Sequence, residues 1–498
     1  MSLQPHESIP LEPAQSSEDD PNALLLPKDG DTDSEQDEHD WEVLEVDDEE
    51  ILEPSIWDNP LLRYSILGIF FLMLLVLLKI IVPRYISSYQ NHRKPDPLYS
   101  NGTHHFQTTV ILISLDGFRP DFLHRGVTPN LLKLGQKASD GVHAEYMYPS
   151  FPPTTFPNHW TLATGLYPEV HGIVANSFYD PKLNQTFYHN QPLISEQTAW
   201  WKGEPIWVTS ALQGIRTAVN MWPGSTVPVE HVRANYVLSY NDSTTPMEKM
   251  DTTLAWLDMP DDERPQFIAV YIPQIDKEGH REGTNGTHMD SSLATVDASI
   301  AYLLDGLSER HLDPHVHMVI VSDHGMTETD PSKWIYYDDI LSPTSLSYLR
   351  DDEEGTALKL LPDIPGNAIQ KIYEELRNHT QAVADPHFEV YLRQEVPERF
   401  HYRNTDRIAP IIIIPEIGYM LLRRNLNETE RGDHNYDNRA PEIHAIFMAK
   451  GPKIEQWYGL GNVVAPFLNV EIYDFLTRLL NIEPAPNNST LHGMFIVH

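Results

Sequence analysis

The chain of 498 residues contains no cysteine. This excludes disulfide bonds, thiolate metal sites and cysteine nucleophiles. Basic residues are also scarce, because 35 Lys and Arg stand against 72 Asp and Glu and leave a formal net charge of −37. A chain this acidic is poorly suited to binding the phosphate backbone of nucleic acids. We therefore expect no nucleic-acid partner.

The shortage of basic residues is greatest in residues 1–62, which hold 20 Asp and Glu but a single basic residue, Lys28. With few aromatic side chains, this segment cannot bury enough apolar surface to offset the entropy of ordering. We expect a disordered, cytosolic tail. Within it, Asp20 precedes the pair Leu24–Leu25 with the spacing of an acidic dileucine sorting signal. Sorting adaptors are therefore candidate partners, the alternative being that the leucines are ordinary parts of a solvated tail.

One long apolar run follows the tail. Tyr64–Val82 has 19 residues and one charged side chain, Lys79. A helix of this length roughly spans the hydrocarbon core of a bilayer. The run is too long, and the acidic tail before it too extensive, for a cleavable signal peptide. We predict a transmembrane helix at residues 63–83, a polar stalk at 84–106 and one large domain at 107–498.

Two signals disagree about the orientation of this span. Basic residues at its end and beyond, such as Lys79 and Arg84, favour a cytosolic carboxyl side. Eight Asn-x-Ser/Thr sequons, two of which begin at the neighbours Asn487 and Asn488, all follow the span and favour a luminal carboxyl side. We follow the sequons and predict a single-pass type II membrane protein of the vacuole, endomembranes or cell surface. The candidate glycosylation sites are Asn101, Asn184, Asn241, Asn285, Asn378, Asn427 and Asn488.

Polar side chains follow the apolar runs of the large domain. Three runs have the composition of buried strands: Thr108–Leu115, Phe267–Ile272 and Val316–Val321. Acidic or histidine residues come after each run, and one more histidine lies in a late loop: Asp116, Asp276, His280, Asp323, His324 and His434. Because open α/β sheets place ligands at the carboxyl ends of their strands, we expect these side chains to converge.

The six oxygen and nitrogen donors are enough for two metal ions with three protein ligands each. Three protein ligands leave a coordination position open for chemistry. Two ions about 4 Å apart form the usual clamp for in-line displacement at phosphorus. Since three of the six donors are imidazoles, Zn²⁺ is favoured over Mg²⁺. We expect two zinc ions per chain, the alternative being that the carboxylates cap helices.

A proline-rich segment, Pro149–His159, carries the threonines Thr154 and Thr155 at its centre. The following stretch, His159–Gly165, has the pattern of a short helix ended by glycine. The N-terminus of a helix offers free N–H groups to an anion. A threonine held there could be a nucleophile facing a phosphate. The alternative is a turn in which Thr154 caps the helix.

These motifs resemble those of the nucleotide pyrophosphatase/phosphodiesterase family, within the alkaline phosphatase superfamily. The resemblance runs from about Thr108 to the carboxyl terminus, with the fungal-type plan of tail, span and catalytic domain. The motifs that carry it are LDGFRPDFL, PTTFPNHWTLATGLYPEVHGIVAN, KGEPIWVT, WPGS, SDHGM, and HNYDN followed by AIFMAKGP. It implies an α/β fold with a central, mostly parallel sheet flanked by helices on both faces.

The resemblance also implies a reaction: zinc-dependent hydrolysis of nucleotides, such as nucleoside triphosphates, to nucleoside monophosphate and pyrophosphate through a covalent nucleotidyl-threonine. Thr155 resembles the nucleophile, and Asn176 with the backbone N–H of Phe156 resembles the holder of the phosphoryl oxygen. Phe156 and Tyr240 resemble the aromatic pair that sandwiches the base, and we predict Trp222 as a further substrate-binding residue. The residues that resemble the ligands of one zinc are Asp276, His280 and His434. Those that resemble the ligands of the other zinc are Asp116, Asp323 and His324.

Two positions depart from the family pattern. Gln274 and Ile275 precede Asp276 where Glu-Pro is usual, and Thr226 stands where an acidic residue often follows Trp-Pro-Gly-Ser. The second departure leaves the base preference open. Two other functions also stay open at this point. One is a phospholipid-cleaving phosphodiesterase or phosphomonoesterase on the same fold, and the other is a non-catalytic glycoprotein.

Overall fold

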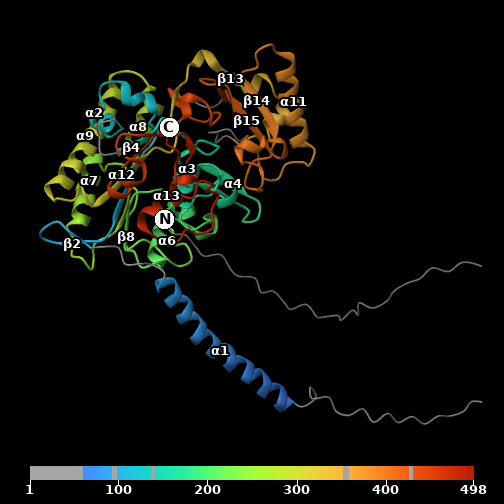
Figure 1. The fold of residues 1–498 in the computed structure, drawn as a ribbon. Coiled ribbons are helices and arrows are strands. Elements are labelled where there is room, and N and C mark those ends of the chain that lie inside the picture. Colours follow the sequence, from blue (N-terminus) through green and yellow to red (C-terminus); the bar gives the residue numbers. More distant parts are fainter. Residues whose placement is uncertain (1–59, 92–97, 136–140, 351–357, 425–429, 498) are drawn as a thin grey trace, which may run out of the picture. The chain divides into compact units, whose positions relative to one another are not determined.

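The structure is a computed structural model of the chain, and it describes residues 60–91, 98–135, 141–350, 358–424 and 430–497. The chain divides into two units, Met1–Leu77 and Leu78–His498. Figure 1 shows the course of the chain. The predicted tail up to residue 59, with the pair Leu24–Leu25, and the sequon at Asn427 lie outside the described residues.

Helix α1 spans Pro60–Asn91. Its first part, Pro60–Leu77, is long and apolar enough to cross a membrane, and none of it is buried inside the protein. Exposed apolar side chains suit a bilayer, which solvates them, and the helix satisfies its own backbone hydrogen bonds. A single helix of this kind near the N-terminus fits a membrane anchor and a signal sequence alike.

An eight-stranded sheet forms the centre of the second unit, in the order β19-β4-β18-β11-β3-β10-β8-β9. Strand β18 runs antiparallel to both of its neighbours, and the other pairs are parallel. The fold predicted from the sequence is therefore confirmed. The strands are β3 (Thr109–Leu115), β4 (Gly141–Ala144), β8 (Thr217–Asn220), β9 (Tyr236–Leu238), β10 (Phe267–Ile272), β11 (Val316–Val321), β18 (Phe447–Lys450) and β19 (Val463–Val464).

The three predicted strands lie side by side at the centre of this sheet. In the register, Ile272 of β10 lies opposite Leu115 of β3, and Val321 of β11 lies opposite Ser114. The carboxyl ends of the three strands are therefore level. The segments that follow them leave the sheet along one edge, which brings their polar side chains together.

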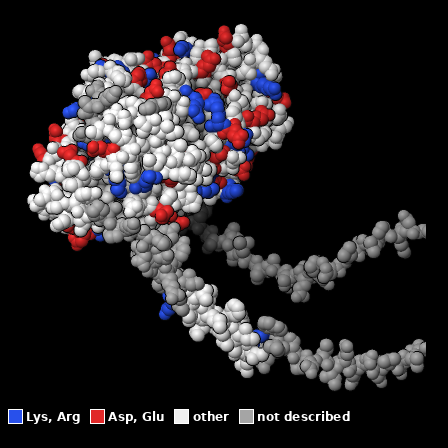
Figure 2. Space-filling model, viewed as in Figure 1, with Lys and Arg blue, Asp and Glu red and all other residues white. Residues whose placement is uncertain are grey.

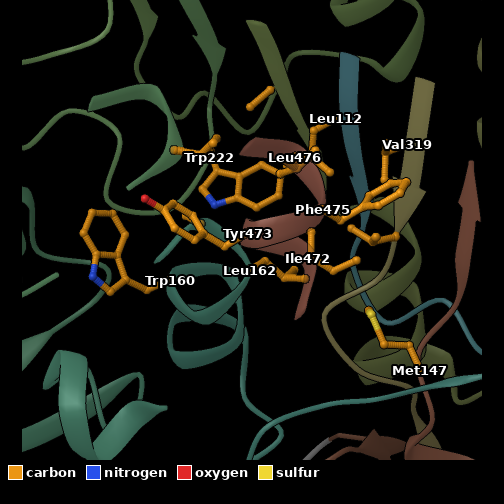
Figure 3. Packing of buried hydrophobic residues seen from close by; sticks show 14 of the residues in the cluster. Leu112, Met147, Trp160, Leu162, Trp222, Val319, Ile472, Tyr473, Phe475 and Leu476 are labelled. Atoms are coloured by element: carbon orange, nitrogen blue, oxygen red, sulfur yellow. The ribbon is translucent and has the colours of Figure 1, made fainter. Parts of the chain in front are cut away.

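Helices cover both faces of the sheet. Successive side chains of a strand point to opposite faces, so a strand of apolar residues presents an apolar surface on each face for helices to cover. Ile111 and Ile113 of β3 belong to one apolar cluster with α7 (Pro246–Leu257) and α9 (Thr287–Glu309). Leu112 belongs to a second cluster with α3 (Thr155–Thr164), α6 (Ile206–Leu212) and α13 (Glu471–Leu480). Figure 3 shows Leu112 and Val319 beside the side chains of α13.

A third apolar cluster lies outside the central sheet, between β11 and β18 in sequence. It includes Tyr337, Ile372, Leu376 and Ile413. Strands β14 and β15 pair antiparallel in it, and β13 and β16 pair parallel. Its elements, drawn in orange in Figure 1, are β13 (Trp334–Tyr336), α10 (Pro343–Leu346), α11 (Ala368–Ala382), β14 (Phe388–Leu392), β15 (Ile411–Pro415) and β16 (Met420–Leu422).

Residues 98–106 of the predicted stalk pack against other parts of the second unit. Strands β1 (Tyr99–Ser100) and β2 (His105–Phe106) pair with each other. The Asn101 side chain donates a hydrogen bond to the Arg310 carbonyl at 2.9 Å, and the Arg264 guanidinium lies 4.0 Å from the centre of the Phe106 ring. Side chains from the carboxyl-terminal part of the predicted stalk therefore contact the domain predicted to begin at residue 107.

Shorter elements complete the second unit. The helices are α2 (Pro129–Gly135), α4 (Pro168–His171), α5 (Pro192–Ser195), α8 (Gln274–Glu282) and α12 (Pro452–Tyr458). The paired short strands are β5 (Met147–Tyr148) with β20 (Phe467–Leu468), β6 (Ser177–Asp180) with β7 (Gln185–Tyr188), and β12 (Thr327–Glu328) with β17 (Gly432–Asp433). On the face of this unit in Figure 2, acidic and basic side chains are interspersed.

Candidate active site

Helix α3 begins at Thr155, four residues before the predicted start. It ends at Thr164, and Gly165 follows in the left-handed conformation (φ 67°) that glycine adopts easily. Thr154 is the N-cap residue in extended conformation, but its side chain makes no capping hydrogen bond. Capping by Thr154, the alternative drawn from the sequence, is therefore not what the structure shows. Thr155 stands at the first turn, where unpaired N–H groups favour an anion.

The six predicted ligands come from four segments. Asp116 follows β3, and Asp323 with His324 follows β11. Asp276 and His280 lie four residues apart on α8, so they share one face of that helix. His434 follows β17. The level strand ends thus bring together the donors that the sequence separates by more than 300 positions.

These donors form two overlapping groups, each with ligand atoms within 4.8 Å of one another. One group is Asp116, Asp323 and His324, as predicted for one ion. The other contains Asp276 and His434, but with His324 in the place predicted for His280. His280 nevertheless adjoins this group, because its Nε2 lies 3.4 Å from Asp276 Oδ1.

The separations between donors suit a tetrahedral metal ion. His324 Nε2 lies 3.0 Å from Asp323 Oδ2 and 3.5 Å from Asp116 Oδ1. His434 Nε2 lies 3.6 Å from Asp276 Oδ1. Two ligands that are each about 2.0–2.1 Å from a tetrahedral zinc are about 3.3 Å apart.

Buried oxygens without partners give a second test of fit. Asp116 Oδ1, Asp276 Oδ1 and Asp323 Oδ2 are buried and accept no hydrogen bond from the residues that the structure describes. Leaving a buried carboxylate oxygen unpaired is costly. These are the same three oxygens that face the histidine Nε2 atoms. The donor set therefore fits a pair of divalent cations.

The three histidines are oriented by backbone carbonyls. Nδ1 lies 2.9 Å from the Gly432 carbonyl in His280, 2.8 Å from that of Gly325 in His324, and 2.6 Å from that of Pro153 in His434. Donation from Nδ1 leaves the Nε2 lone pair for a metal, which is the usual arrangement around histidine ligands.

Like charges are crowded in the site. Burial, together with the carboxylates of Asp276 and Asp323, holds the pKa of Asp116 well above its usual range. Burial and the neighbouring His324 and His280 hold the pKa of His434 well below its usual range. A bound cation would relieve the repulsion among the carboxylates.

The nucleophile candidate and the anion-holding pair lie beside these donors. Thr155 Oγ1 is 3.5 Å from His324 Nε2. The backbone N–H of Phe156 donates to Asn176 Oδ1 at 3.0 Å, so these two predicted groups are neighbours. Thr155, Phe156 and Asn176 line one cavity of about 970 Å³. Three of the predicted ligands, Asp276, His280 and His434, line the same cavity.

Phe156, Tyr240 and Trp222, the predicted substrate-binding residues, line the same cavity. Tyr240 is 51% exposed, and its hydroxyl donates to Asp242 at 2.8 Å. Trp222 is buried, and its indole N–H donates to the His159 carbonyl at 3.0 Å. Trp222 can therefore offer a ligand its ring surface but not its N–H group.

Two residues that the sequence reasoning missed support the ligands. The Tyr271 hydroxyl donates to Asp116 Oδ2 at 2.5 Å. Nδ1 of the fully buried His159 lies 3.2 Å from Asp323 Oδ2 and 2.8 Å from the Thr155 carbonyl. A tyrosine in the otherwise apolar strand β10, and a histidine one helical turn after Thr155, were the available signals.

Residues 110–437 match the family model described as type I phosphodiesterase / nucleotide pyrophosphatase. The chain belongs to this family. An uncharacterized pyrophosphatase/phosphodiesterase of Schizosaccharomyces pombe is 40% identical over 403 residues, which cover 79% of this chain and 81% of that relative. Ectonucleotide pyrophosphatase/phosphodiesterase family member 3 of Bos taurus is 37% identical over 389 residues. That match covers 77% of this chain but only 43% of the bovine relative.

Solved structures of the family show the same fold. An inactive variant of murine ectonucleotide pyrophosphatase/phosphodiesterase 5, in complex with AMP, superposes with a TM-score of 0.70 at 29% identity. The match covers 78% of this chain and all of the murine chain. This chain is thus a hydrolase of the phosphodiesterase/pyrophosphatase class, and its Asp/His groups suit the metal dependence typical of the family.

Proposed function

We propose that this chain is a membrane-anchored, zinc-dependent phosphodiesterase that releases a nucleoside monophosphate from nucleotides such as nucleoside triphosphates. One observation carries the proposal. A threonine hydroxyl at a helix N-terminus lies 3.5 Å from a histidine Nε2. The carboxylate oxygens beside that histidine are buried and have no hydrogen-bond partner in the described part of the chain. This arrangement combines a nucleophile with donors for the cations that activate it.

Asp276, His280 and His434 are the proposed ligands of one zinc, and Asp116, Asp323 and His324 those of the other. When bound, the two ions supply the charge that lowers the pKa of a hydroxyl and stabilises a leaving oxygen. His324 belongs to both observed groups. It therefore lies where the two ions would be nearest each other.

Thr155 is the proposed nucleophile. Its oxygen forms a bond to phosphorus, the bond from phosphorus to the leaving oxygen breaks, and a water later releases the nucleotide from Thr155. The amide of Asn176 donates to a phosphoryl oxygen, and so does the backbone N–H of Phe156 once the substrate replaces the bond that this N–H donates to Asn176 Oδ1. The base lies between the rings of Phe156 and Tyr240, against Trp222. The AMP bound by the murine relative supports a nucleotide as the ligand.

The test of this proposal compares two variants of Thr155. Thr155→Ala should lose nearly all release of nucleoside monophosphate, while folding and metal content stay unchanged, and Thr155→Ser should keep part of it because the hydroxyl remains. Substrates are ATP, a dinucleoside polyphosphate and a choline phosphodiester. An alanine variant as active as wild type would exclude the covalent mechanism, and preference for the choline diester would exclude the nucleotide assignment.

The proposed topology places residues 1–62 in the cytosol, the membrane span at 63–83 and everything after it in the lumen or outside the cell. Among the described sequons, Asn184, Asn241, Asn285 and Asn378 are exposed, and Asn101 and Asn488 are half-buried. Glycosidase treatment of the membrane protein should lower its apparent mass. An unchanged mass in a eukaryotic host would contradict the proposed topology.

Replacing both leucines of Leu24–Leu25 by alanine should move the protein to the cell surface if sorting adaptors bind these leucines.

A further inference from the structure

We propose that Asn435 is a positioning residue that fixes the nucleophile through the hydroxyl of Thr154. The inference rests on the proposed function, since it assigns a role to the neighbour of Thr155. It concerns the contact between two segments that are 281 residues apart in sequence. One segment carries the nucleophile, and the other carries the proposed ligand His434.

The first observation is the direction of the Thr154 side chain. A threonine at an N-cap position ordinarily accepts a hydrogen bond from the first turn of its helix. The Thr154 side chain does not do so. Its hydroxyl instead donates to Asn435 Oδ1 at 3.2 Å. The Thr154 side chain thus makes a hydrogen bond to a residue distant in sequence and none to the first turn of its own helix.

The second observation is that the Asn435 amide is held in one orientation. Its Nδ2 donates to Asp433 Oδ1 at 2.7 Å, and its backbone N–H donates to the same oxygen at 3.1 Å. The backbone N–H of His434 also donates to Asp433 Oδ1, at 2.7 Å. Because a carboxylate only accepts hydrogen bonds, it selects the amide nitrogen and leaves the amide oxygen for Thr154.

Further hydrogen bonds hold the backbone of residues 152–154, which precede Thr155. Asn158 Nδ2 donates to the carbonyls of Pro152 and Thr154, each at 2.9 Å. His434 Nδ1 lies 2.6 Å from the Pro153 carbonyl. Asn158 therefore fixes the backbone before Thr155, while the Thr154–Asn435 bond ties the same backbone to the loop that carries His434.

Thr154 is 7% exposed and Asn435 is 8% exposed, and both line the cavity of the candidate site, so water can reach this bond only from the cavity. Breaking it leaves a buried acceptor unpaired and frees the residue that precedes Thr155 to rotate. A displacement of about 1 Å in a reacting group can lower a rate about a hundredfold. Loss of the bond should therefore act on kcat much more than on substrate binding.

The experiment uses the full chain and four variants. Thr154→Val removes the hydroxyl at nearly constant shape, and Thr154→Ser keeps it. Asn435→Ala removes the acceptor, and the fourth variant combines Thr154→Val with Asn435→Ala. We expect Thr154→Val and Asn435→Ala each to lower kcat about 10–100-fold with KM changed less than about threefold. The serine variant should stay within about threefold of wild type, and the combined variant should be no slower than the slower single variant.

Two readouts are independent of turnover. Zinc content should equal that of wild type in all variants, and amide hydrogen exchange in residues 150–160 should be faster in Thr154→Val and Asn435→Ala than in Thr154→Ser. Loss of zinc from Asn435→Ala, additive losses in the combined variant, or unchanged kcat in both single variants would each overturn the inference. Failure of the proposed function is separate, because it would show as an inactive wild-type protein.

Discussion

Two sets of buried carboxylates in the second unit differ in how they are paired. Those of the candidate site, on Asp116, Asp276 and Asp323, each have one oxygen to which no described residue donates a hydrogen bond. Asp180, by contrast, accepts from the Arg407 guanidinium at 2.6 Å and from two backbone N–H groups of the turn that follows it. Both sets are buried in the same unit, so burial alone does not explain the difference.

Two further acids resemble Asp180. Glu471 accepts four hydrogen bonds, among them those of the backbone N–H groups of Thr490 and Leu491 at 2.9 Å each. Asp297 accepts from the backbone N–H groups of Asn130 and Leu131 and so caps α2. These acids connect segments that are distant in sequence. Their hydrogen bonds stabilise the folded protein whether or not a ligand is bound.

The difference separates residues that stabilise the fold from residues that prepare it for a ligand. An acid that the protein pairs completely contributes to folding, whereas an acid left partly unpaired lowers stability until a cation binds. The candidate site concentrates three such acids within a few ångströms. Function therefore opposes stability at this place, and removal of the ligand should expose the opposition.

Of the changes considered, chelation of the metal should have the largest effect on activity and stability. Removing divalent metal should reduce hydrolysis to background, lower the melting temperature, and allow zinc to restore both, because the carboxylates repel each other without a cation. Elemental analysis should find about two zinc ions per active chain. Thr155→Ala should show the same shift in melting temperature, since it lacks only the nucleophile. Full activity in a metal-free preparation would contradict the assignment.

Neutralising one acid from each set should give opposite results. Asp116→Asn should lower kcat more than about a hundredfold, because it removes a proposed ligand. The metal-free variant should nevertheless unfold at the same temperature or higher, because burial and the carboxylates of Asp276 and Asp323 already hold the pKa of Asp116 well above its usual range. Asp297→Asn should keep kcat but lower the free energy of unfolding by about 1–3 kcal/mol, because two N–H groups lose their charged acceptor. Calorimetry of both metal-free variants measures the contrast. Equal destabilisation by the two substitutions would erase the distinction.

A buried base gives the smallest effect. Lys249 is 1% exposed, its ammonium donates to the Tyr271 carbonyl at 2.7 Å, and burial lowers its pKa to about 8. Since the pKa in the unfolded chain is about 10.4, the unfolded state binds more protons between about pH 8 and pH 10.4. Wild type should therefore gain stability relative to Lys249→Met as the pH rises through this window, by at most about 1.4 kcal/mol per pH unit. A difference that is independent of pH would show that Lys249 keeps its ordinary pKa.

The sequence predicted the parts of the structure that rest on local pattern. The runs at 267–272 and 316–321 are β10 and β11 with their predicted bounds, because continuous β-branched and aliphatic residues suit a strand buried on both faces. The six proposed ligands lie together because each follows a strand or lies in a motif of fixed spacing. The start of α3 was predicted four residues too late, since three prolines near Thr155 disguised the first turn.

Contacts between distant side chains could not be predicted in the same way. The position of His324 in both donor groups depends on how β11 is placed beside β3, and no local pattern encodes it. The bond from Thr154 to Asn435 joins two residues that look like ordinary turn residues in sequence. The hydrogen bonds of residues 98–106 to the packed domain were likewise missed, because a polar segment with two prolines has the composition of a stalk.

The separation between Thr155 and His434 has a consequence for synthesis of the protein. The proposed nucleophile, Thr155, is made 279 residues before the last proposed ligand, His434. A nascent chain therefore cannot assemble the candidate site until His434 has been made and the long-range contacts have closed, which are slow steps in folding. Enzymatic activity is for this reason a report of completed folding, and a chain truncated before β17 should be silent however well its amino-terminal half is folded.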